Sequence, residues 1–349
     1  MFRLRVFPAG DGDCLLLTYG DAPPYHHILV DGGRQAAYQA LRPALVEIAG
    51  AGEAIELLIL THIDADHIEG LLAMGTDPQM PLVPKQVWYN GFDQLTALEA
   101  MGERQADRYS ELLASLQWPL NVETSGGAVM IETITRPVDV AGLTLTLLSP
   151  DRAKLALLHQ RWAAWRTVEA ARVAARELRK IDGLEAMGRA PMPAALDVDA
   201  LAEPTSIDPE PPNGSSIAFI AEWRGRRVLM GGDAHPDLLA RSLAALSDEP
   251  VPVDLFKVPH HGSHGNCTRE LVERLDCRRH VISTDGSRHG HPDPQAIARL
   301  LKYGPAGRKE LHCNYRTTRT TPWNDDALQA LHNYDIYFPE HSDVLEIDI

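Results

Sequence analysis

The 349-residue chain has few cysteines, and no two of them are spaced as Cys-x-x-Cys. A cysteine-rich zinc finger and a dithiol redox motif are therefore excluded. Isolated cysteines are typical of small apolar side chains buried in a protein of a reducing compartment. The four residues are Cys14, Cys267, Cys277 and Cys313. Their number and spacing favour a cytoplasmic protein.

The sequence also lacks long apolar runs and an excess of positive charge. No segment reaches the roughly 20 apolar residues that a membrane-spanning helix needs, and the opening residues 1–5 do not resemble a signal peptide. The 33 Lys and Arg are outnumbered by 48 Asp and Glu, which gives a net charge of −15. We therefore expect a soluble, cytoplasmic protein that does not associate with membranes and does not bind nucleic acid broadly and nonspecifically.

Short apolar segments alternate with amphipathic ones, which predicts an α/β protein with a layered fold. Segments 2–7, 13–19 and 28–30 are separated by turns rich in Gly and Asp, and they predict an antiparallel meander. Further strands are expected at 55–60, 86–89, 128–134, 143–148, 216–223, 227–230, 253–258, 280–284, 310–313 and 343–348. Helices are expected at 36–49, 67–73, 104–117, 236–246 and 293–302.

Residues 151–212 interrupt this pattern within a single expected domain of residues 1–349. Segment 152–190 carries nine Lys and Arg against four acids, and Leu155, Leu158, Trp162, Trp165 and Val173 fall on one helical face. A helix with an apolar stripe and a solvated basic face is a more economical interpretation than a substrate clamp. Segment 191–212 is rich in Pro and acidic residues, which predicts a partly mobile loop.

One buried strand is followed at once by two imidazoles and two carboxylates. The apolar residues 57–60 lead into Thr61-His62-Ile63-Asp64-Ala65-Asp66-His67. Such groups are costly to bury unless they are paired or bind a metal. We expect His62 and Asp64 to hold one ion, and Asp66 and His67 a second. The alternative, in which Asp66 caps the following helix, accounts for only one of the four groups.

Two later strands end in the same way. Asp233 follows Gly231-Gly232, and His260-His261 follow segment 253–258. Loops at strand ends, held by a rigid scaffold, are where binding sites are usually built. Because neighbouring residues at a strand end point to different sides, we expect one of the two histidines to bind metal. The other would contact substrate or donate a proton.

These residues also carry a family resemblance. Thr-His-x-Asp-x-Asp-His resembles the metallo-β-lactamase superfamily motif His-x-His-x-Asp-His, with Asp64 at the position of the second histidine. The opening hairpin with Gly12-Asp13-Cys14, the Asp31-Gly32-Gly33 turn and the Arg288–Pro292 turn are similar to the hydrolase domain of ComEC-type DNA-uptake proteins. The likeness covers roughly 1–150 and 213–320.

The resemblance implies a four-layer αββα sandwich with a helical insertion and a site for two divalent ions, Zn or Mn. The metal ligands would be His62, Asp64, Asp66, His67, Asp233, His260 and His261. Asp31 would orient a ligand histidine, although a turn-forming role is equally consistent, and His291 would lie in the outer shell or contact substrate.

One expected ligand is missing. The superfamily usually has a further histidine before Asp233, but the only candidate is His159 in the insertion. Asn213, in Asn213-Gly214-Ser215-Ser216, stands in the matching region and would be a weak ligand or an outer-shell group. An oxygen-rich first site broadens tolerance toward Mn²⁺ relative to Zn²⁺.

The resemblance implies a metal-dependent hydrolase, with a phosphodiesterase or nuclease acting on nucleic acid or a nucleotide as the first hypothesis. Asp66 would orient the attacking hydroxide, and His260 or His261 would act as the acid. Alternatives are a lactonase or other ester hydrolase, or a metal-stabilised, non-catalytic regulatory subunit. Relatives of this kind occur in bacterial antiviral defence clusters, so protein partners or a homo-oligomer are further expectations.

Overall fold

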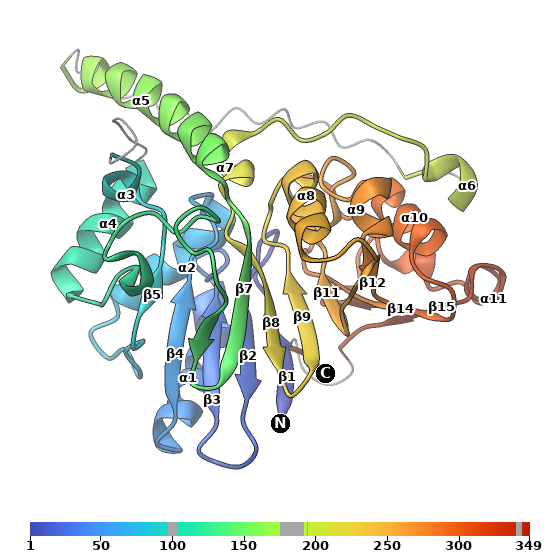
Figure 1. Ribbon diagram of the computed structural model, residues 1–349, viewed down its shortest axis with the longest axis horizontal. Helices are drawn as coiled ribbons and strands as arrows, with labels where there is room; N and C mark the ends of the chain where they lie inside the picture. Colours follow the sequence, from blue (N-terminus) through green and yellow to red (C-terminus); the bar gives the residue numbers. More distant parts are fainter. Residues whose placement is uncertain (97–103, 175–191, 194, 340–343) are drawn as a thin grey trace.

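The computed structural model describes residues 1–96, 104–174, 192–193, 195–339 and 344–349, whose strands form two large sheets (Figure 1). The first sheet has the order β16-β1-β2-β3-β4-β5 and the second β15-β14-β13-β11-β9-β8-β7-β6. The first comprises β1 Phe2–Val6, β2 Leu15–Tyr19, β3 His26–Val30, β4 Ala54–Ile59, β5 Val87–Trp88 and β16 Leu345–Asp348. The second comprises β6 Val138–Val140, β7 Leu143–Ser149, β8 Ala218–Trp223, β9 Arg226–Met230, β11 Leu255–Lys257, β13 Arg279–Ile282, β14 Lys309–Cys313 and β15 Tyr334–Tyr337.

The sheets change from antiparallel to parallel pairing along the chain. Strands β1, β2 and β3 form the expected antiparallel meander, and β4 and β5 then join in parallel. In the second sheet β6 to β9 are antiparallel, whereas β9, β11, β13, β14 and β15 are parallel. A short parallel pair, β10 Val251–Pro252 and β12 Leu275–Asp276, lies outside both sheets. Parallel strands bring their carboxyl ends to one edge, which places the loops that follow them together.

Three apolar clusters define four layers. One cluster fills the space between the two sheets, where Leu57 and Ile59 of β4 meet Val228 and Met230 of β9. A second packs the outer face of the first sheet against helices, and a third does the same for the second sheet. Because both faces of each sheet are covered, the central strands are apolar on both sides. The chain is therefore a four-layer αββα sandwich, as the sequence predicted.

The outer layers are helical, with α3 and α4 on one flank and α8 to α10 on the other (Figure 1). The helices before the insertion are α1 Ala37–Gly50, α2 Ala65–Gly75, α3 Phe92–Thr96 and α4 Arg104–Leu116. Those in and after it are α5 Arg152–Ala174, α6 Val198–Leu201, α7 Pro211–Gly214, α8 Pro236–Leu246, α9 Arg269–Glu273, α10 Pro294–Tyr303 and α11 Asp326–His332. Single turns of 3₁₀ helix lie at Val122–Thr124 and Thr321–Trp323, and Pro259–Gly262 forms a tight turn whose central residues are left-handed. Within the described residues, no helix combines the length and the apolar character needed to cross a membrane.

The strand expected at 128–134 does not form, and that prediction was wrong. The segment runs through turns. The Asn90 side chain pairs with both backbone groups of Val129, at 2.8 Å each, and Thr133 closes a turn onto Ala128 and Met130. These side chains meet the backbone hydrogen-bonding needs that a sheet ladder would otherwise meet.

The insertion begins as the expected helix. Leu155, Leu158 and Trp162 are buried against the first helical layer, and α5 then rises away from the body of the molecule (Figure 1). The side chains of Trp165 and Val173, and residues 175–190, lie outside the described part of the chain.

The loop expected at 191–212 forms in its greater part, but it also includes two short helices and is anchored to the body. It contains α6 and α7, and buried Arg299 holds residues 202–205 through the backbone oxygens of Ala202 and Glu203. Proline and acidic composition alone did not reveal this anchor, which comes from α10, almost 100 residues later.

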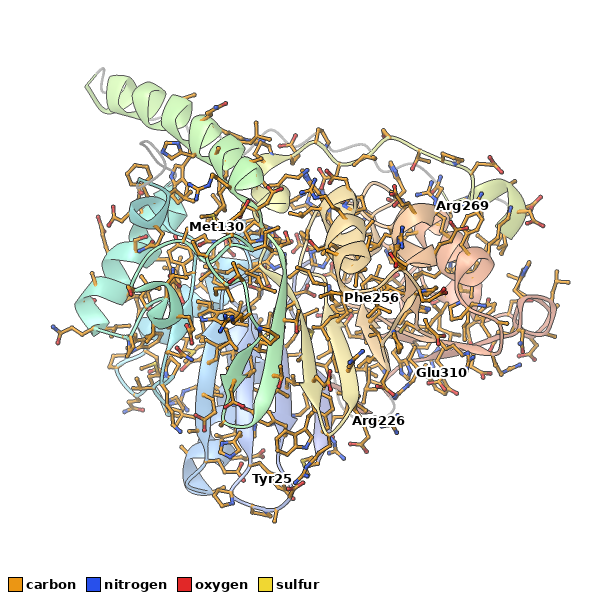
Figure 2. The ribbon with its side chains drawn as sticks, viewed as in Figure 1. Tyr25, Met130, Arg226, Phe256, Arg269 and Glu310 are labelled. Atoms are coloured by element: carbon orange, nitrogen blue, oxygen red, sulfur yellow. The ribbon has the colours of Figure 1, made fainter. Side chains whose placement is uncertain are left out.

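A buried histidine in the second sheet gives a prediction for stability. His280 on β13 is 2% exposed, packs edge-on against Phe256 (labelled in Figure 2) and has no hydrogen-bond partner for either ring nitrogen. Burial, with repulsion from Lys309 and His312, lowers the pKa of His280 to about 3. The folded state therefore keeps this ring neutral at pH values where the unfolded chain, with an ordinary pKa near ~6.5, binds a proton.

The stabilising contribution of neutral His280 is complete above about pH 6.5 and is lost as the pH falls below that value. Between pH 6.5 and pH 5 the loss should be about 2 kcal/mol. Urea unfolding over the same pH range should show that the free energy of unfolding of His280→Leu falls by about 2 kcal/mol less than that of the wild type. Parallel pH profiles for the two proteins would refute the prediction.

Candidate metal centre

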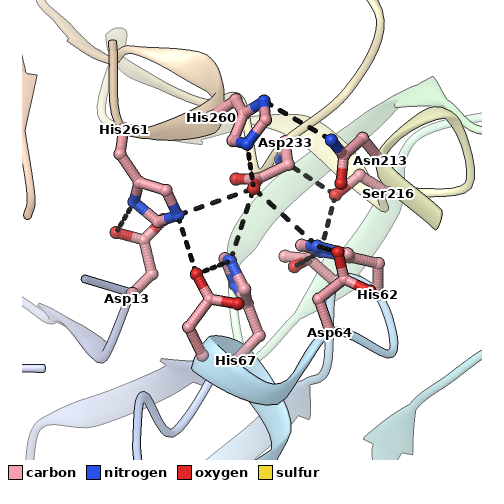
Figure 3. A network of polar contacts seen from close by, with 12 residues as sticks. Asp13, His62, Asp64, His67, Asn213, Ser216, Asp233, His260 and His261 are labelled. Carbon is pink, nitrogen blue, oxygen red and sulfur yellow. Dashed lines mark hydrogen bonds and ion pairs between the residues drawn. The ribbon is translucent and has the colours of Figure 1, made fainter. Parts of the chain in front are cut away.

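The candidate ligands meet at one end of the sandwich, where several strands end. The segment after β4 supplies His62 to His67, the turn after β9 supplies Asp233, and the turn after β11 supplies His260 and His261 (Figure 3). These loops come from both sheets. The site therefore lies where the two sheets meet, at their carboxyl edge.

The start of α2 presents its polar side chains to the site instead of using them as caps. Asp64 is the N-cap residue in an extended conformation, but its side chain makes no capping hydrogen bond. Asp66 lies in the first helical turn. The alternative in which Asp66 caps the helix was therefore wrong, and both carboxylates are available as ligands.

Two glycines allow α2 to approach the neighbouring loops closely. A Cβ on Gly12 would lie 1.7 Å from the backbone oxygen of Asp66, and one on Gly70 would lie 1.9 Å from that of Gly32. The backbone N–H of Gly32 also donates to the oxygen of His67 at 2.8 Å. The helix start is thus fixed by backbone contacts that only glycine permits at these positions.

His260 and His261 point to the same place. Both have left-handed backbone conformations, with φ values of 47° and 54°. Two consecutive left-handed residues abolish the alternation of an extended strand, so the expectation that they point to different sides does not hold. Their Nε2 atoms lie 3.8 Å and 3.5 Å from Asp233 Oδ2.

Four of the candidate ligands form what we call the first half-site: His62, Asp64, His260 and Asp233. His62 Nε2 lies 3.6 Å from Asp64 Oδ2 and 3.8 Å from Asp233 Oδ2. Asn213 on α7 lies beside it, with Nδ2 3.4 Å from His260 Nδ1 and a buried Oδ1 without a partner. Asn213 therefore lies where both roles expected of it, weak ligand or outer-shell group, would place it.

The second half-site consists of Asp66, His67, His261 and the same Asp233. Asp66 Oδ2 lies 3.4 Å from His261 Nε2 and 3.8 Å from His67 Nε2, and His67 Nε2 lies 3.5 Å from Asp233 Oδ2. One oxygen of Asp233 thus faces all four imidazoles (Figure 3). A carboxylate in this position can bridge two ions.

These separations fit ligands around metal ions better than they fit hydrogen bonds. Two ligand atoms, each about 2.1 Å from one ion in tetrahedral geometry, are about 3.4 Å apart. The Nε2 atoms of His62, His67 and His261 and Oδ1 of Asp233 are buried and have no hydrogen-bond partner. Buried polar atoms are rarely left unpaired, so this donor set fits divalent cations.

The opposite nitrogens of these three rings have partners, and those of His67 and His261 are acceptors that fix the tautomer of each ring. His67 Nδ1 donates to Asp31 Oδ2 at 2.8 Å, and His261 Nδ1 donates to the backbone oxygen of Ser283 at 2.8 Å. His62 Nδ1 lies 3.1 Å from Thr61 Oγ1 and 3.2 Å from Ser216 Oγ. Such outer contacts direct Nε2 of each ring toward a metal. They also support the orienting role predicted for Asp31.

The sequence analysis missed Asp13 as a buried member of this region. Its carboxylate clusters with His67, Asp233 and His261 closely enough to be a ligand. However, its Oδ2 is 2.6 Å from the ammonium of Lys257, and its Oδ1 lies 3.7 Å from the rear nitrogen of His261, Nδ1. We therefore assign Asp66 to the second half-site and Asp13 to the layer behind it. The only sequence signal was the Gly12-Asp13-Cys14 turn.

Two other candidate residues lie apart from Asp233. His159, on α5, stacks on Phe92, so it does not replace the missing histidine. His291 is close to the site but contacts His260, with ring centroids 5.1 Å apart. Burial lowers the pKa of His291 to about 4, against the opposing effect of Asp293. His291 is therefore neutral near pH 7.

The carboxylates dominate the electrostatics of the site. Burial alone would lower the pKa of His67 and His261, but Asp233 and the other nearby carboxylates hold both well above the usual range. The pKa of His260 is likewise raised to about 9. Burial would raise the pKa of Asp66 and Asp233, but the imidazoles hold both well below the usual range. Protons on these rings would have to leave before metal binds, so metal binding should release protons.

Known proteins resemble this chain over one short sequence segment and, in structure, over nearly its whole length. No family model matches the chain. A 99-residue segment is 26% identical to ComE operon protein 3 of Bacillus subtilis; it is 28% of this chain but only 12% of that protein. The four layers, together with the candidate ligand loops after β4, β9 and β11 at one end of the sandwich, are the arrangement that the sequence resemblance to the metallo-β-lactamase superfamily implies.

Several solved structures align with nearly the whole chain at low sequence identity. The metallo-β-lactamase fold protein YhfI from Bacillus subtilis has 11% identity and a TM-score of 0.43, with 99% of this chain and 100% of that one covered. Human tRNase Z, short form, has 13% identity and a TM-score of 0.45 at the same coverage. Zinc-bound PqqB from Methylobacterium extorquens has 12% identity and a TM-score of 0.42, again at the same coverage.

Proposed function

We propose that the chain is a metal-dependent hydrolase with a dinuclear centre, and that its substrate is a phosphodiester. The observation that carries the proposal is the position of Asp233, whose Oδ2 faces the Nε2 atoms of four histidines at 3.5–3.8 Å. The resemblance of the motifs to the hydrolase domain of ComEC-type proteins supports the phosphodiester as substrate. Two bound divalent ions would supply an activated water and stabilise developing negative charge.

The protein's own groups have separate roles in this proposal. Asp66, with its side chain 13% exposed, would orient the attacking water by accepting its hydrogen bond. Asp64 and His260 are more exposed, at 28% and 20%, whereas His67 and His261 are buried. Substrate would therefore reach the centre from the first half-site.

The geometry does not favour the role of general acid that the sequence predicted for His260 or His261. The Nε2 of each ring faces Asp233. The Nδ1 of His260 lies 2.9 Å from Asn266 Oδ1, and that of His261 donates to the Ser283 backbone. Neither ring keeps a nitrogen free for the leaving group. We assign both histidines to positioning the centre.

Purified protein should take up two divalent ions per chain, with Mn²⁺ at least competitive with Zn²⁺ for activation. The reason is the carboxylate Asp64 and the amide Asn213 in the first half-site, since oxygen ligands favour Mn²⁺ more than imidazoles do. Elemental analysis gives the stoichiometry. Hydrolysis of bis(p-nitrophenyl) phosphate across a metal series, with an ester and a lactone as comparison substrates, gives the activity.

Uptake of no metal would refute the proposed centre. Activity with Zn²⁺ alone at equal occupancy would refute the oxygen-ligand argument. Turnover of the lactone or the ester without turnover of the phosphodiester would refute the phosphodiester as substrate. It would instead favour the alternative, a lactonase or other ester hydrolase.

A further inference from the structure

Asp208 lies directly behind a metal-site histidine, although it belongs to the insertion. It is part of residues 202–210, which we call the strap. The Asp208 side chain is 6% exposed, and its Oδ2 lies 3.2 Å from His260 Nδ1. The same oxygen accepts hydrogen bonds from Asn213 Nδ2 at 2.7 Å and from Asn266 Nδ2 at 2.9 Å. Asp208 thus stands behind His260 as Asp31 stands behind His67.

The strap is held in place by a buried guanidinium. Arg299 of α10, 1% exposed, donates to the Glu203 oxygen at 2.5 Å and to Thr205 Oγ1 at 2.9 Å. It also donates to the backbone oxygens of His264 at 2.7 Å and Cys267 at 3.1 Å. Arg299 therefore joins the strap to the loop that follows the two metal-site histidines.

The contact between strap and loop is close at Asp208 itself. Its backbone N–H donates to the Gly265 oxygen at 3.2 Å, and a Cβ on Gly265 would lie 2.9 Å from that nitrogen. This backbone contact fixes the Asp208 carboxylate next to three nitrogen atoms: His260 Nδ1, Asn213 Nδ2 and Asn266 Nδ2. All three belong to or adjoin the first half-site. The histidines of the second half-site have other partners, Asp31 and Ser283.

We propose that Asp208 is a positioning residue that sets the affinity of the first half-site for its divalent cation, so that the inserted strap is part of the metal centre. The proposal depends on the proposed function, because it presumes that the centre binds two ions. Asp208 Oδ2 and Asn266 Oδ1, at 3.2 Å and 2.9 Å, share the Nδ1–H of His260 and keep its Nε2 directed at Asp233. Asp208 also holds the amide of Asn213, which leaves Oδ1 of that residue facing the site.

The test is a calorimetric titration of metal-free protein with Mn²⁺, which resolves two binding steps when the sites differ in affinity. In Asp208→Asn the shape of the side chain is kept and the charge is lost. One step should weaken by about 10-fold or more, the usual effect of removing an outer partner of a ligand, and the other step should not change. Thr205→Val, which loosens the strap without touching His260, should weaken the same step to a smaller extent.

Asp199→Asn is the matched control, because Asp199 precedes the strap with its side chain 82% exposed. It should bind both ions as the wild type does. Melting curves of the metal-free variants should coincide with the wild-type curve, which separates positioning from general destabilisation.

Two unchanged steps in Asp208→Asn, or equal weakening of both, would overturn the proposal while leaving the dinuclear centre intact. If the wild type binds no ion, the proposed function fails, and this inference fails with it.

Discussion

Asp66→Asn should abolish nearly all phosphodiester hydrolysis while the chain stays folded. We expect turnover of bis(p-nitrophenyl) phosphate to fall by about 10³-fold or more, which corresponds to about 4 kcal/mol of transition-state stabilisation. The variant keeps the size of the side chain but removes the charge that faces His67 and His261 at 3.8 Å and 3.4 Å. Metal binding in the second half-site and orientation of the attacking water are lost together.

Glu69→Gln is the control for this experiment, since it makes the same chemical change on the same helix. Its side chain is 30% exposed, and the residue follows His67 by two positions on α2. It should keep near-normal turnover. Measuring the metal content together with the kinetics separates the two effects of Asp66→Asn, loss of metal binding and loss of orientation of the attacking water. A folded Asp66→Asn protein with near-normal turnover would contradict the mechanism.

The sequence was informative where local chemistry and local structure coincide. A run of apolar residues followed by His-x-Asp-x-Asp-His is sufficient to place ligands at a strand end, because imidazoles and carboxylates at that density are costly to bury unless they bind a metal or one another. A layered α/β fold follows from short apolar strands that alternate with helices, and the resemblance of the motifs implied the αββα order of its layers. For these features, the residues that determine the outcome are neighbours in the chain.

The sequence was less informative where distant segments meet. Asp208 lies behind His260 only because Arg299 anchors the strap, and Asp13 lies behind His261 only because Lys257 is buried beside it. In the sequence, both aspartates stand in segments that are predicted to be turns or loops, where acidic residues are common. These contacts depend on tertiary packing, which periodicity and spacing do not encode.

The direction of His260 and His261 shows a different limit. Strand alternation predicted opposite sides, but both residues adopt left-handed backbone conformations. Such conformations are rare for residues with side chains and are maintained only when surrounding contacts require them. Here the backbone of His260 donates to Gly232 at 2.9 Å, and Pro259 and Gly262 flank the pair. Strain of this kind at a candidate centre is a tertiary feature that no local rule would have supplied.

Asp13→Ala should destabilise the metal-free protein by about 3–5 kcal/mol, the usual effect of removing one partner of a buried ion pair. Asp13 and Lys257 are 1% and 0% exposed, and their charged atoms are 2.6 Å apart. Burial would raise the pKa of Asp13, but attraction to Lys257 and His261 outweighs this and holds it well below the usual range. Without Asp13 the ammonium keeps, among the residues that the structure describes, only the Val258 backbone oxygen at 3.1 Å. Urea unfolding in the presence of a chelator measures the loss.

Asp13→Ala combined with Lys257→Met should regain most of the lost stability, because no unpaired charge is then left in the interior. The exposed ion pair Arg269–Glu273 is the control, and Glu273→Ala should cause no measurable change. The double variant also tests the assignment of Asp13. If Asp13 only supports His261 from behind, the double variant should still bind two ions. Loss of the second ion from a stable double variant would instead make Asp13 a ligand, in place of Asp66.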